Sequence, residues 1–207
     1  MSTPAAERQG IRIRMREARA ALDAEQRASA AAAVTAGLAG VELLRTAETI
    51  AGYRAIRGEV DIDEALLRLI DRGATVTVPR VVGDDLEFVE WLPTTPARKG
   101  AFGISEPVGG GVLDLSVHDV VLAPLVAFDH AGQRLGQGGG FYDRSLARLG
   151  DPGPVVIGIA HSFQEVARIP AEPWDIPLDA VVTDTRIAAF RPGVLQRSIS
   201  ANRPPQE

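Results

Sequence analysis

The chain has 207 residues, a net charge of −5 at pH 7, 45% hydrophobic and 24% charged residues, and no cysteine. This composition is ordinary for one globular domain, and the lack of cysteine excludes disulfides, thiolate zinc sites and a cysteine nucleophile. The net negative charge does not favour nucleic acid or an anionic membrane as a partner. No apolar run approaches the roughly 20 residues of a membrane span, and the first residues lack the apolar core of a secretory signal. We therefore expect a cytoplasmic protein that binds neither nucleic acid nor membrane.

Two helices are predicted at the N-terminus. Pro4 suits the first turn of a helix that runs to about Leu22 and carries an apolar stripe at helical spacing. Asp23 followed by Gln26 is typical of a capping box, and an Ala-rich helix is expected from there to about Gly40. The first helix also carries a second stripe, formed by Arg8, Arg12, Arg16 and Arg19.

The rest of the chain alternates between predicted strands and helices. Strands are expected over residues 49–55, 75–81, 86–91, 119–129, 154–160 and 179–184, the last of these being the final strand. Helices are expected over 61–73 and 141–149, with a short helix candidate in 161–167 and a loop over 93–118. This alternation predicts one α/β domain over 5–190 with a largely parallel sheet between helical layers. Residues 191–207 are predicted to form a polar, disordered tail.

A glycine-rich loop follows the long apolar strand over 119–129, with five glycines among residues 132–140. Glycine lets backbone N–H groups converge on an anion, and the start of the next helix adds positive charge. In such folds ligands bind at the carboxyl ends of the strands, so the loop predicts a phosphate site. The loop matches neither a Walker A motif nor a dinucleotide fingerprint. Arg134 before it, and Tyr142 and Asp143 after it, are residue types of a nucleotide–magnesium site; a flexible surface turn is the alternative.

The segment PLVAFDHAGQRLGQGGGFYDR (124–144) resembles the hallmark motif of the 5-formyltetrahydrofolate cyclo-ligase family. Further motifs of that family are matched in order by the basic first helix, GEVD (58–61), VPR (78–80), GAFGISEP (100–107) and FQEVARIPAEPWDIPLD (163–179). The resemblance covers about residues 8–186. It implies a single three-layer α/β/α domain with a mostly parallel central sheet, of the NagB/RpiA/CoA-transferase-like type. The sequence has no sustained heptad and no large apolar stripe that would argue for an obligate oligomer, so a monomer is expected. It also implies a ligase that uses ATP and Mg²⁺ to cyclise 5-formyltetrahydrofolate to 5,10-methenyltetrahydrofolate, releasing ADP and phosphate.

The resemblance also implies the site residues. Arg134 and Tyr142 would be catalytic, and Asp143 and Asp175 would hold Mg²⁺. The ATP site would comprise Arg8, Arg12, Arg134, Leu135, Gly136, Gln137, Gly138, Gly139, Gly140, Phe141 and Tyr142. The folate site would comprise Arg54, Glu59, Gln137, Gly138, Gly139, Gly140 and Phe141, with Phe102 and Trp174 at its border.

Plainer interpretations of the same residues stay open. Arg16 and Arg19 are interpreted as the solvated face of an amphipathic helix. Arg134 could form a structural salt bridge, Asp143 could serve the helix start, and Asp175 could be a turn residue. The chain has Arg8 where the family usually has lysine, and the neutral Gln137 at a position that can be basic. The alternative functions are a nucleotide- or folate-binding relative without catalysis, and an ATP-dependent ligase with another substrate on the same scaffold.

Overall fold

The computed structural model describes residues 3–100, 103, 105–150 and 152–198. Its main sheet has eight strands among these residues, in the order β12-β11-β10-β7-β1-β2-β3-β6. They are β1 (Thr49–Ala51), β2 (Thr75–Val82), β3 (Asp85–Glu90), β6 (Val112–Leu113), β7 (Val120–Pro124), β10 (Val155–Ala160), β11 (Ala180–Thr183) and β12 (Ile187–Ala189). The five central strands pair in parallel, and the outer pairs of β12 and of β3 and β6 are antiparallel. The predicted α/β fold with a mostly parallel sheet is confirmed.

The order of the central strands reverses its direction between β1 and β7, and this place is the topological switch point of the sheet. From β1 the chain moves to β2 on one side, and it later returns to place β7 on the other side of β1. Connections that leave two neighbouring strands in opposite directions open a crevice at their carboxyl ends. Ligands of this architecture are therefore expected beyond Ala51 and Pro124.

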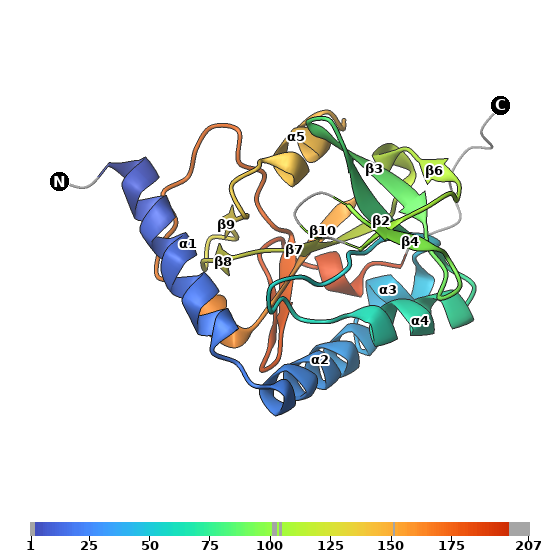
Figure 1. The fold of residues 1–207 in the computed structure, drawn as a ribbon, viewed down its shortest axis with the longest axis horizontal. Helices are drawn as coiled ribbons and strands as arrows, with labels where there is room; N and C mark the ends of the chain where they lie inside the picture. The colour runs from blue at the N-terminus through green and yellow to red at the C-terminus, as the bar shows by residue number, and fades with distance from the viewer. Residues whose placement is uncertain (1–2, 101–102, 104, 151, 199–207) are drawn as a thin grey trace.

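The sheet is covered on both faces, because successive residues of its strands point to opposite sides. Val120 and Leu122 pack under the helices α2 (Ala24–Ala39), α3 (Glu42–Thr46) and α4 (Asp63–Asp71). Val121 and Ala123 face the other core, which is closed by α5 (Phe141–Ala147), the 3₁₀ turn η2 (Leu115–Val117) and loops. Figure 1 shows α5 on the side of the sheet opposite to α2, α3 and α4.

Helix α1 (Pro4–Ala20) lies at the edge of the molecule, beside the small hairpin of β8 (Ala127–Phe128) and β9 (Arg134–Leu135) (Figure 1). The sequence signals at both first helices are confirmed. Thr3 caps α1 with Pro4 in its first turn, and Asp23 and Gln26 form the capping box of α2. A small apolar cluster attaches α1 to the hairpin; its buried members are Ile11, Ala127, Leu135 and Ile169.

The predicted strand over 119–129 is wrong in its second half, because the chain leaves the sheet after Pro124. The carbonyl groups of Leu125 and Val126 accept hydrogen bonds from the side chain of Gln164, and Val126 N–H donates to Leu135 O. These side-chain and hairpin bonds replace the ladder of the main sheet. Only Ala127–Phe128 then form strand β8, in a separate pair with β9.

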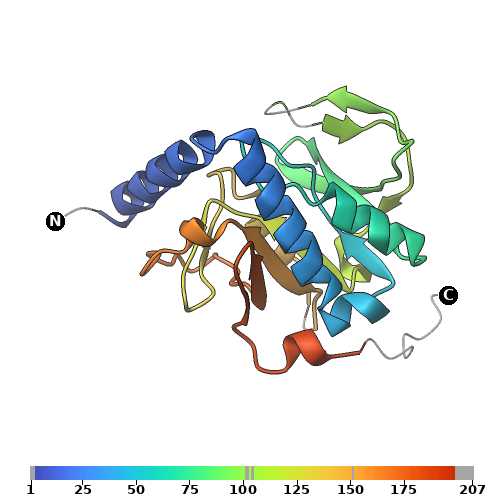
Figure 2. The same ribbon diagram turned by 90° about the horizontal axis from the view of Figure 1, so that it is seen from below.

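Other boundaries also differ from the prediction. The expected strand over 49–55 is confined to β1, the region 93–118 contains short strands, and β12 follows the strand expected to be the last. The short strands of the 93–118 region are β6 and the two strands of a hairpin, β4 (Ala97–Lys99) and β5 (Ser105–Pro107). This hairpin projects from the body of the molecule in Figure 2. The helix candidate in 161–167 is only a 3₁₀ turn, η3 (Ser162–Gln164), because Val166 N–H bonds Phe128 O instead.

The tail predicted to be disordered from residue 191 is ordered where it is described. Residues 191–198 include the 3₁₀ turn η4 (Val194–Gln196), and Val194 and Leu195 are buried in the core under the helices. Residues 199–207 lie outside the described part of the chain. Among the helices of the described residues, none has the length and apolar character required to cross a membrane.

Candidate active site

A pocket of about 220 Å³ opens at the switch point of the sheet. One wall is the segment after β1, which contributes Tyr53, Arg54, Ile56, Arg57 and Glu59. The opposite wall is the glycine loop with the start of α5, which contributes Arg134, Gly136, Gln137, Gly139, Gly140, Phe141, Tyr142 and Asp143. Strands β2, β3 and β7 supply its floor through Pro79, Val81, Leu86 and Pro124. Two segments that are far apart in the sequence, and that carry most of the predicted site residues, therefore face one space.

Glu59 is nearly buried, with 6% of its side chain exposed. It accepts hydrogen bonds from Ile56 N–H (3.2 Å) and from the side-chain amide of Gln137 (3.1 Å), and Arg19 Nη1 lies 3.6 Å away. Burial raises the pKa of Glu59, and Arg19 is the strongest influence in the opposite direction. The predicted folate-side carboxylate is therefore a desolvated group whose charge depends on its neighbours.

Arg54 lies at the mouth of the pocket. Its guanidinium is 3.1 Å from Asp63 Oδ2 and stacks over the ring of Trp91, 4.9 Å from the ring centroid. The side chain is 29% exposed, so the cation reaches solvent at the pocket entrance. Such a cation can meet an anionic part of a ligand that extends out of the pocket.

The arginines of α1 contact the loops of the site. Arg8 donates to both carboxylate oxygens of Asp175 (2.5 and 3.1 Å), and Arg12 Nε donates to Gly136 O (3.0 Å). Arg16 donates to the side-chain oxygen of Gln137 (3.1 Å) and to its backbone carbonyl (2.7 Å). Helix α1 thus holds the glycine loop and the 170–176 segment together.

The interpretation of Arg16 and Arg19 as a solvated stripe is wrong. Arg16 is half-buried against Gln137, and Arg19 has no exposed surface. Both face the site because a helix places residues four and three apart on one side, next to Arg8 and Arg12. The regular spacing of the four arginines was the signal in the sequence that could have identified them.

Arg134 and Tyr142 are buried polar residues of the pocket wall. Arg134 Nη2 donates to Asp143 Oδ1 (2.7 Å), while its Nε and the hydroxyl of Tyr142 are buried with no hydrogen-bond partner among the described residues. Burial raises the pKa of Tyr142 well above its usual value, and the nearby Glu59 raises it further. Tyr142 is therefore a neutral donor. A buried donor without a partner is costly, which is expected where a ligand supplies the acceptor.

The structure brings Asp143 and Asp175 together. Asp143 Oδ1 accepts from the N–H of Ile176 (3.2 Å), the residue after Asp175. Mg²⁺ commonly takes one or two carboxylates from a protein, while phosphate oxygens and waters complete its coordination shell. Asp143 and Asp175 therefore fit the ion. Among the described residues, no group of three or more His, Cys, Asp or Glu side chains could hold a metal ion, so Asp143 and Asp175 would have to serve as a pair.

The glycine loop has a backbone that other residues adopt only with strain. Gly138 and Gly140 have φ of +109° and +67°, and Gly140 is the N-cap residue just before α5. A side chain on Gly136 would meet no atom within 4 Å, so open space lies beside this backbone. The loop is therefore shaped to approach a ligand closely.

Two residues expected at the folate border are not part of the described pocket. Trp174 is 64% exposed and does not line it, and Phe102 lies outside the described residues. The structure adds Tyr53, Ile56 and Arg57 to the lining, and these three residues lie outside the motifs found in the sequence.

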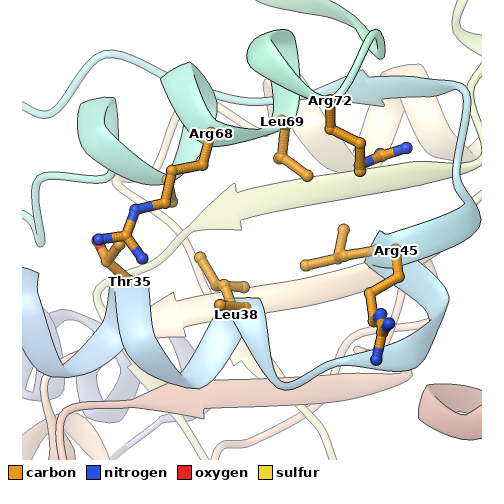
Figure 3. A pocket seen from close by; sticks show the side chains of 9 residues that line it. Thr35, Leu38, Arg45, Arg68, Leu69 and Arg72 are labelled. Atoms are coloured by element: carbon orange, nitrogen blue, oxygen red, sulfur yellow. The ribbon is translucent and has the colours of Figure 1, made fainter.

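A second pocket, of about 180 Å³, lies between α2, α3 and α4 (Figure 3). Its polar rim consists of Arg45, Arg68 and Arg72. These contact Glu42, Glu64 and the carbonyl oxygen of Ala47. Helices α3 and α4 end here just before β1 and β2, so the pocket is at the amino ends of the strands. Its arginines are already paired, and it lies away from the switch point, where the predicted site residues gather.

Comparison with known proteins agrees with the motifs. Residues 4–184 match the sequence model of the 5-formyltetrahydrofolate cyclo-ligase family. A Haemophilus influenzae protein named 5-formyltetrahydrofolate cyclo-ligase is 38% identical over 176 residues, which cover 83% of this chain and 94% of that protein. An Escherichia coli K12 protein of the same name is 39% identical over 146 residues, which cover 68% of this chain and 80% of that protein.

Solved structures show the same likeness. The NMR structure of Aquifex aeolicus 5,10-methenyltetrahydrofolate synthetase superposes with a TM-score of 0.79 at 32% identity, covering 94% of this chain and 97% of that one. The 5,10-methenyltetrahydrofolate synthetase of Mycoplasma pneumoniae gives a TM-score of 0.71 at 28% identity, covering 86% of this chain and 98% of that one.

Proposed function

The chain belongs to the 5-formyltetrahydrofolate cyclo-ligase family, and we propose that its switch-point pocket cyclises 5-formyltetrahydrofolate to 5,10-methenyltetrahydrofolate at the expense of ATP. The observation that carries this proposal is the pocket itself. A carboxylate suited to the folate ring, Glu59, and a glycine loop suited to phosphates line one space, and Gln137 touches both. A site for two ligands that react with each other requires this arrangement.

The chemistry needs phosphate because a formamide oxygen is a poor leaving group. The formyl oxygen attacks the γ-phosphorus of ATP and ADP leaves, giving an imidate-like phosphate. N10 of the folate then attacks the formyl carbon and the ring closes. N10 loses its proton to solvent, and phosphate departs with the former formyl oxygen. The protein must hold the reacting atoms in line and stabilise charge as it moves between oxygens.

The phosphates of ATP are assigned to the α1 arginines and the loop Arg134–Phe141. Arg12 already bonds the loop at Gly136, and Arg8, one turn earlier on the same helix face, lies beside Asp175. The N-terminus of α5 adds positive potential. The change from lysine to Arg8 keeps the charge, and the neutral Gln137 leaves the electrostatic load to the arginines.

Asp143 and Asp175 would hold Mg²⁺, which supplies charge neutralisation and orientation of the phosphates when bound. Each aspartate is paired with an arginine, Asp143 with Arg134 and Asp175 with Arg8. The four side chains together are close to neutral, so they can accept a cation and phosphate anions together at little electrostatic cost.

Arg134 and Tyr142 are assigned to the reacting oxygens. Both line the pocket, and each has a buried donor for which the described residues supply no acceptor. A cation and a neutral hydroxyl that are already held in place can stabilise an oxygen whose negative charge grows in the transition state. Glu59 and Arg54 are assigned to the folate, Glu59 as acceptor for ring N–H groups and Arg54 at the pocket mouth.

The proposal is tested by adding 5-formyltetrahydrofolate and magnesium-ATP and recording the absorbance of the methenyl product in the near ultraviolet. We expect an ATP-dependent band, and a rate at least about 100-fold lower for Asp143→Ala with an unchanged circular dichroism spectrum. Asp71→Ala, which removes an exposed aspartate at the end of α4, is the matched control and should retain the rate. ATP binding without the band would favour a binding protein or a ligase for another substrate.

We further propose that the enzyme works in the cytoplasm as a monomer. An enzyme without cysteines needs no oxidising compartment, and every residue assigned above comes from one chain. Light scattering on a sizing column should give a mass near 21.9 kDa.

A further inference from the structure

Arg19 is the largest fully buried side chain that carries a charge in the described part of the chain. Its Nη1 lies 3.6 Å from Glu59 Oε1 and 3.4 Å from Leu125 O, while Nε and Nη2 have no hydrogen-bond partner within the described ranges. Arginine is almost never fully buried unless it is paired. A guanidinium that is desolvated and only partly satisfied is costly to fold, so its presence calls for a function other than stability.

The backbone around Arg19 brings it to Glu59. Gly58 has φ of +75°, and a side chain there would lie 3.0 Å from Arg19 O. Glycine is thus required for the loop before Glu59 to pass directly over α1. His161 Nε2 contacts Gly58 O at 3.0 Å and holds the loop from the other side.

We propose that Arg19 is the positioning residue of the folate site: it holds Glu59 in place and keeps it ionised so that it can accept hydrogen bonds from the substrate. The inference rests on the proposed function, in which Glu59 binds the folate ring. Arg19 acts through Glu59 and does not line the pocket itself.

The groups that face Glu59 support this assignment. Arg19 approaches Glu59 from α1, and Arg57 lies in the loop that carries Glu59 itself. Gln137 approaches from the glycine loop, and the tyrosine rings of Tyr53 and Tyr142 from the pocket wall. Arg57 is exposed, so water screens its charge, whereas the charge of Arg19 acts through a dry interior. Arg19 is therefore the cation that offsets the cost of burying the carboxylate.

Two variants and one control test the inference. Arg19→Met removes the charge at similar volume, Arg19→Lys keeps it, and Arg14→Met removes an exposed arginine of the same helix. Without the cation the pKa of Glu59 should rise, so Glu59 becomes protonated at higher pH. For Arg19→Met we expect the acid limb of kcat/KM for 5-formyltetrahydrofolate to move up by roughly one pH unit, with recovery at higher pH.

At neutral pH the same variant should raise the KM for 5-formyltetrahydrofolate about tenfold and the KM for ATP less than about twofold. Arg19→Lys should restore much of the pH profile of kcat/KM, and Arg14→Met should give the same values as the parent chain. In a Glu59→Gln background, Arg19→Met should raise the KM for 5-formyltetrahydrofolate little further, because the carboxylate on which Arg19 acts is gone. A decrease in kcat/KM that is equal at every pH and for both substrates would mean that Arg19 only anchors α1. That result would overturn the inference.

A measurement without substrate separates this inference from the proposed function. The ¹³C carboxyl signal of Glu59, identified by its absence in Glu59→Gln, is titrated in the ligand-free protein. Its pKa should be higher in Arg19→Met than in the parent chain, and an unchanged pKa overturns the inference even if the enzyme is active. Absence of turnover in the parent chain with a shifted pKa would instead reject the proposed function alone. If Arg19→Met does not fold, Arg19→Gln takes its place.

Discussion

At the scale of the residue, the arginines of α1 show how one residue type serves different purposes on one helix face. Arg8 pairs with a carboxylate, Arg12 bonds a loop carbonyl, and Arg19 is sealed in the interior. Their spacing indicates a common face, but burial and partner are set by segments that are distant in the sequence. The same applies to Tyr142, whose hydroxyl we propose to act on the substrate because no acceptor in the described part of the chain reaches it.

Tyr142→Phe should separate catalysis from stability. Removing a buried hydroxyl that has no partner should leave the thermal midpoint unchanged or slightly higher, since no hydrogen bond is lost. If the hydroxyl donates to a reacting oxygen, kcat should fall roughly 10- to 1,000-fold with little change in the KM for ATP. Steady-state kinetics and a thermal melt on the same preparation check both outcomes. An unchanged kcat would remove Tyr142 from the catalytic residues.

At the scale of the element, the site is built from a helix and a loop that meet. Gln137 of the glycine loop bonds Arg16 of α1 and also Glu59 of the segment after β1. The loop therefore contacts both sides of the pocket before any ligand binds. Its glycines differ in what they contribute: Gly140 is needed for its backbone conformation, and Gly136 for the space beside it.

Two alanine variants should distinguish these contributions. Gly140→Ala forces a side chain into a left-handed conformation, 2.8 Å from Arg144 Nη1, and should lower the free energy of unfolding by about 1–2 kcal/mol. Gly136→Ala meets no atom within 4 Å and should change stability by less than about 0.5 kcal/mol. Because its methyl group occupies the space assigned to phosphate, Gly136→Ala should nevertheless raise the KM for ATP. Urea denaturation and kinetics test the pair, and equal stability losses would contradict this distinction.

At the scale of the whole molecule, the parallel sheet determines where chemistry can occur. Its switch point lies between β1 and β7, and the pocket opens at their carboxyl ends. The same fold also buries two histidines. His118 shares a hydrogen bond with Thr77 (2.8 Å), and His161 with Gly58 O (3.0 Å).

These two histidines predict how stability depends on pH. Burial lowers the pKa of His118 and of His161, so both stay neutral in the folded chain while the unfolded chain takes up protons near pH 6.5. The unfolded state then binds more protons, and stability should decrease as pH falls through about 6.5 toward the lower folded-state pKa values. Thermal midpoints between pH 7.5 and 5 should decline less steeply in His118→Gln. His130→Gln, which changes an exposed histidine, should keep the parent slope.

The sequence by itself determined the features that neighbouring residues encode. Pro4 and the Asp23–Gln26 pair mark helix starts, the apolar runs mark the central strands, and the motif over 124–144 identifies the family and the glycine loop. Each of these signals depends on residues a few positions apart, so it can be recognised without knowledge of the fold.

Only the tertiary structure decided which distant segments meet. It ended the main-sheet strand at Pro124, because the carbonyls that follow are taken by Gln164, and it packed Val194 into the core although the tail appeared polar. It buried Arg19 beside Glu59 and joined Arg8 to Asp175, 167 residues apart. The free energy of such contacts depends on burial and on the exclusion of water, which are properties of the folded chain and not of any short stretch of it.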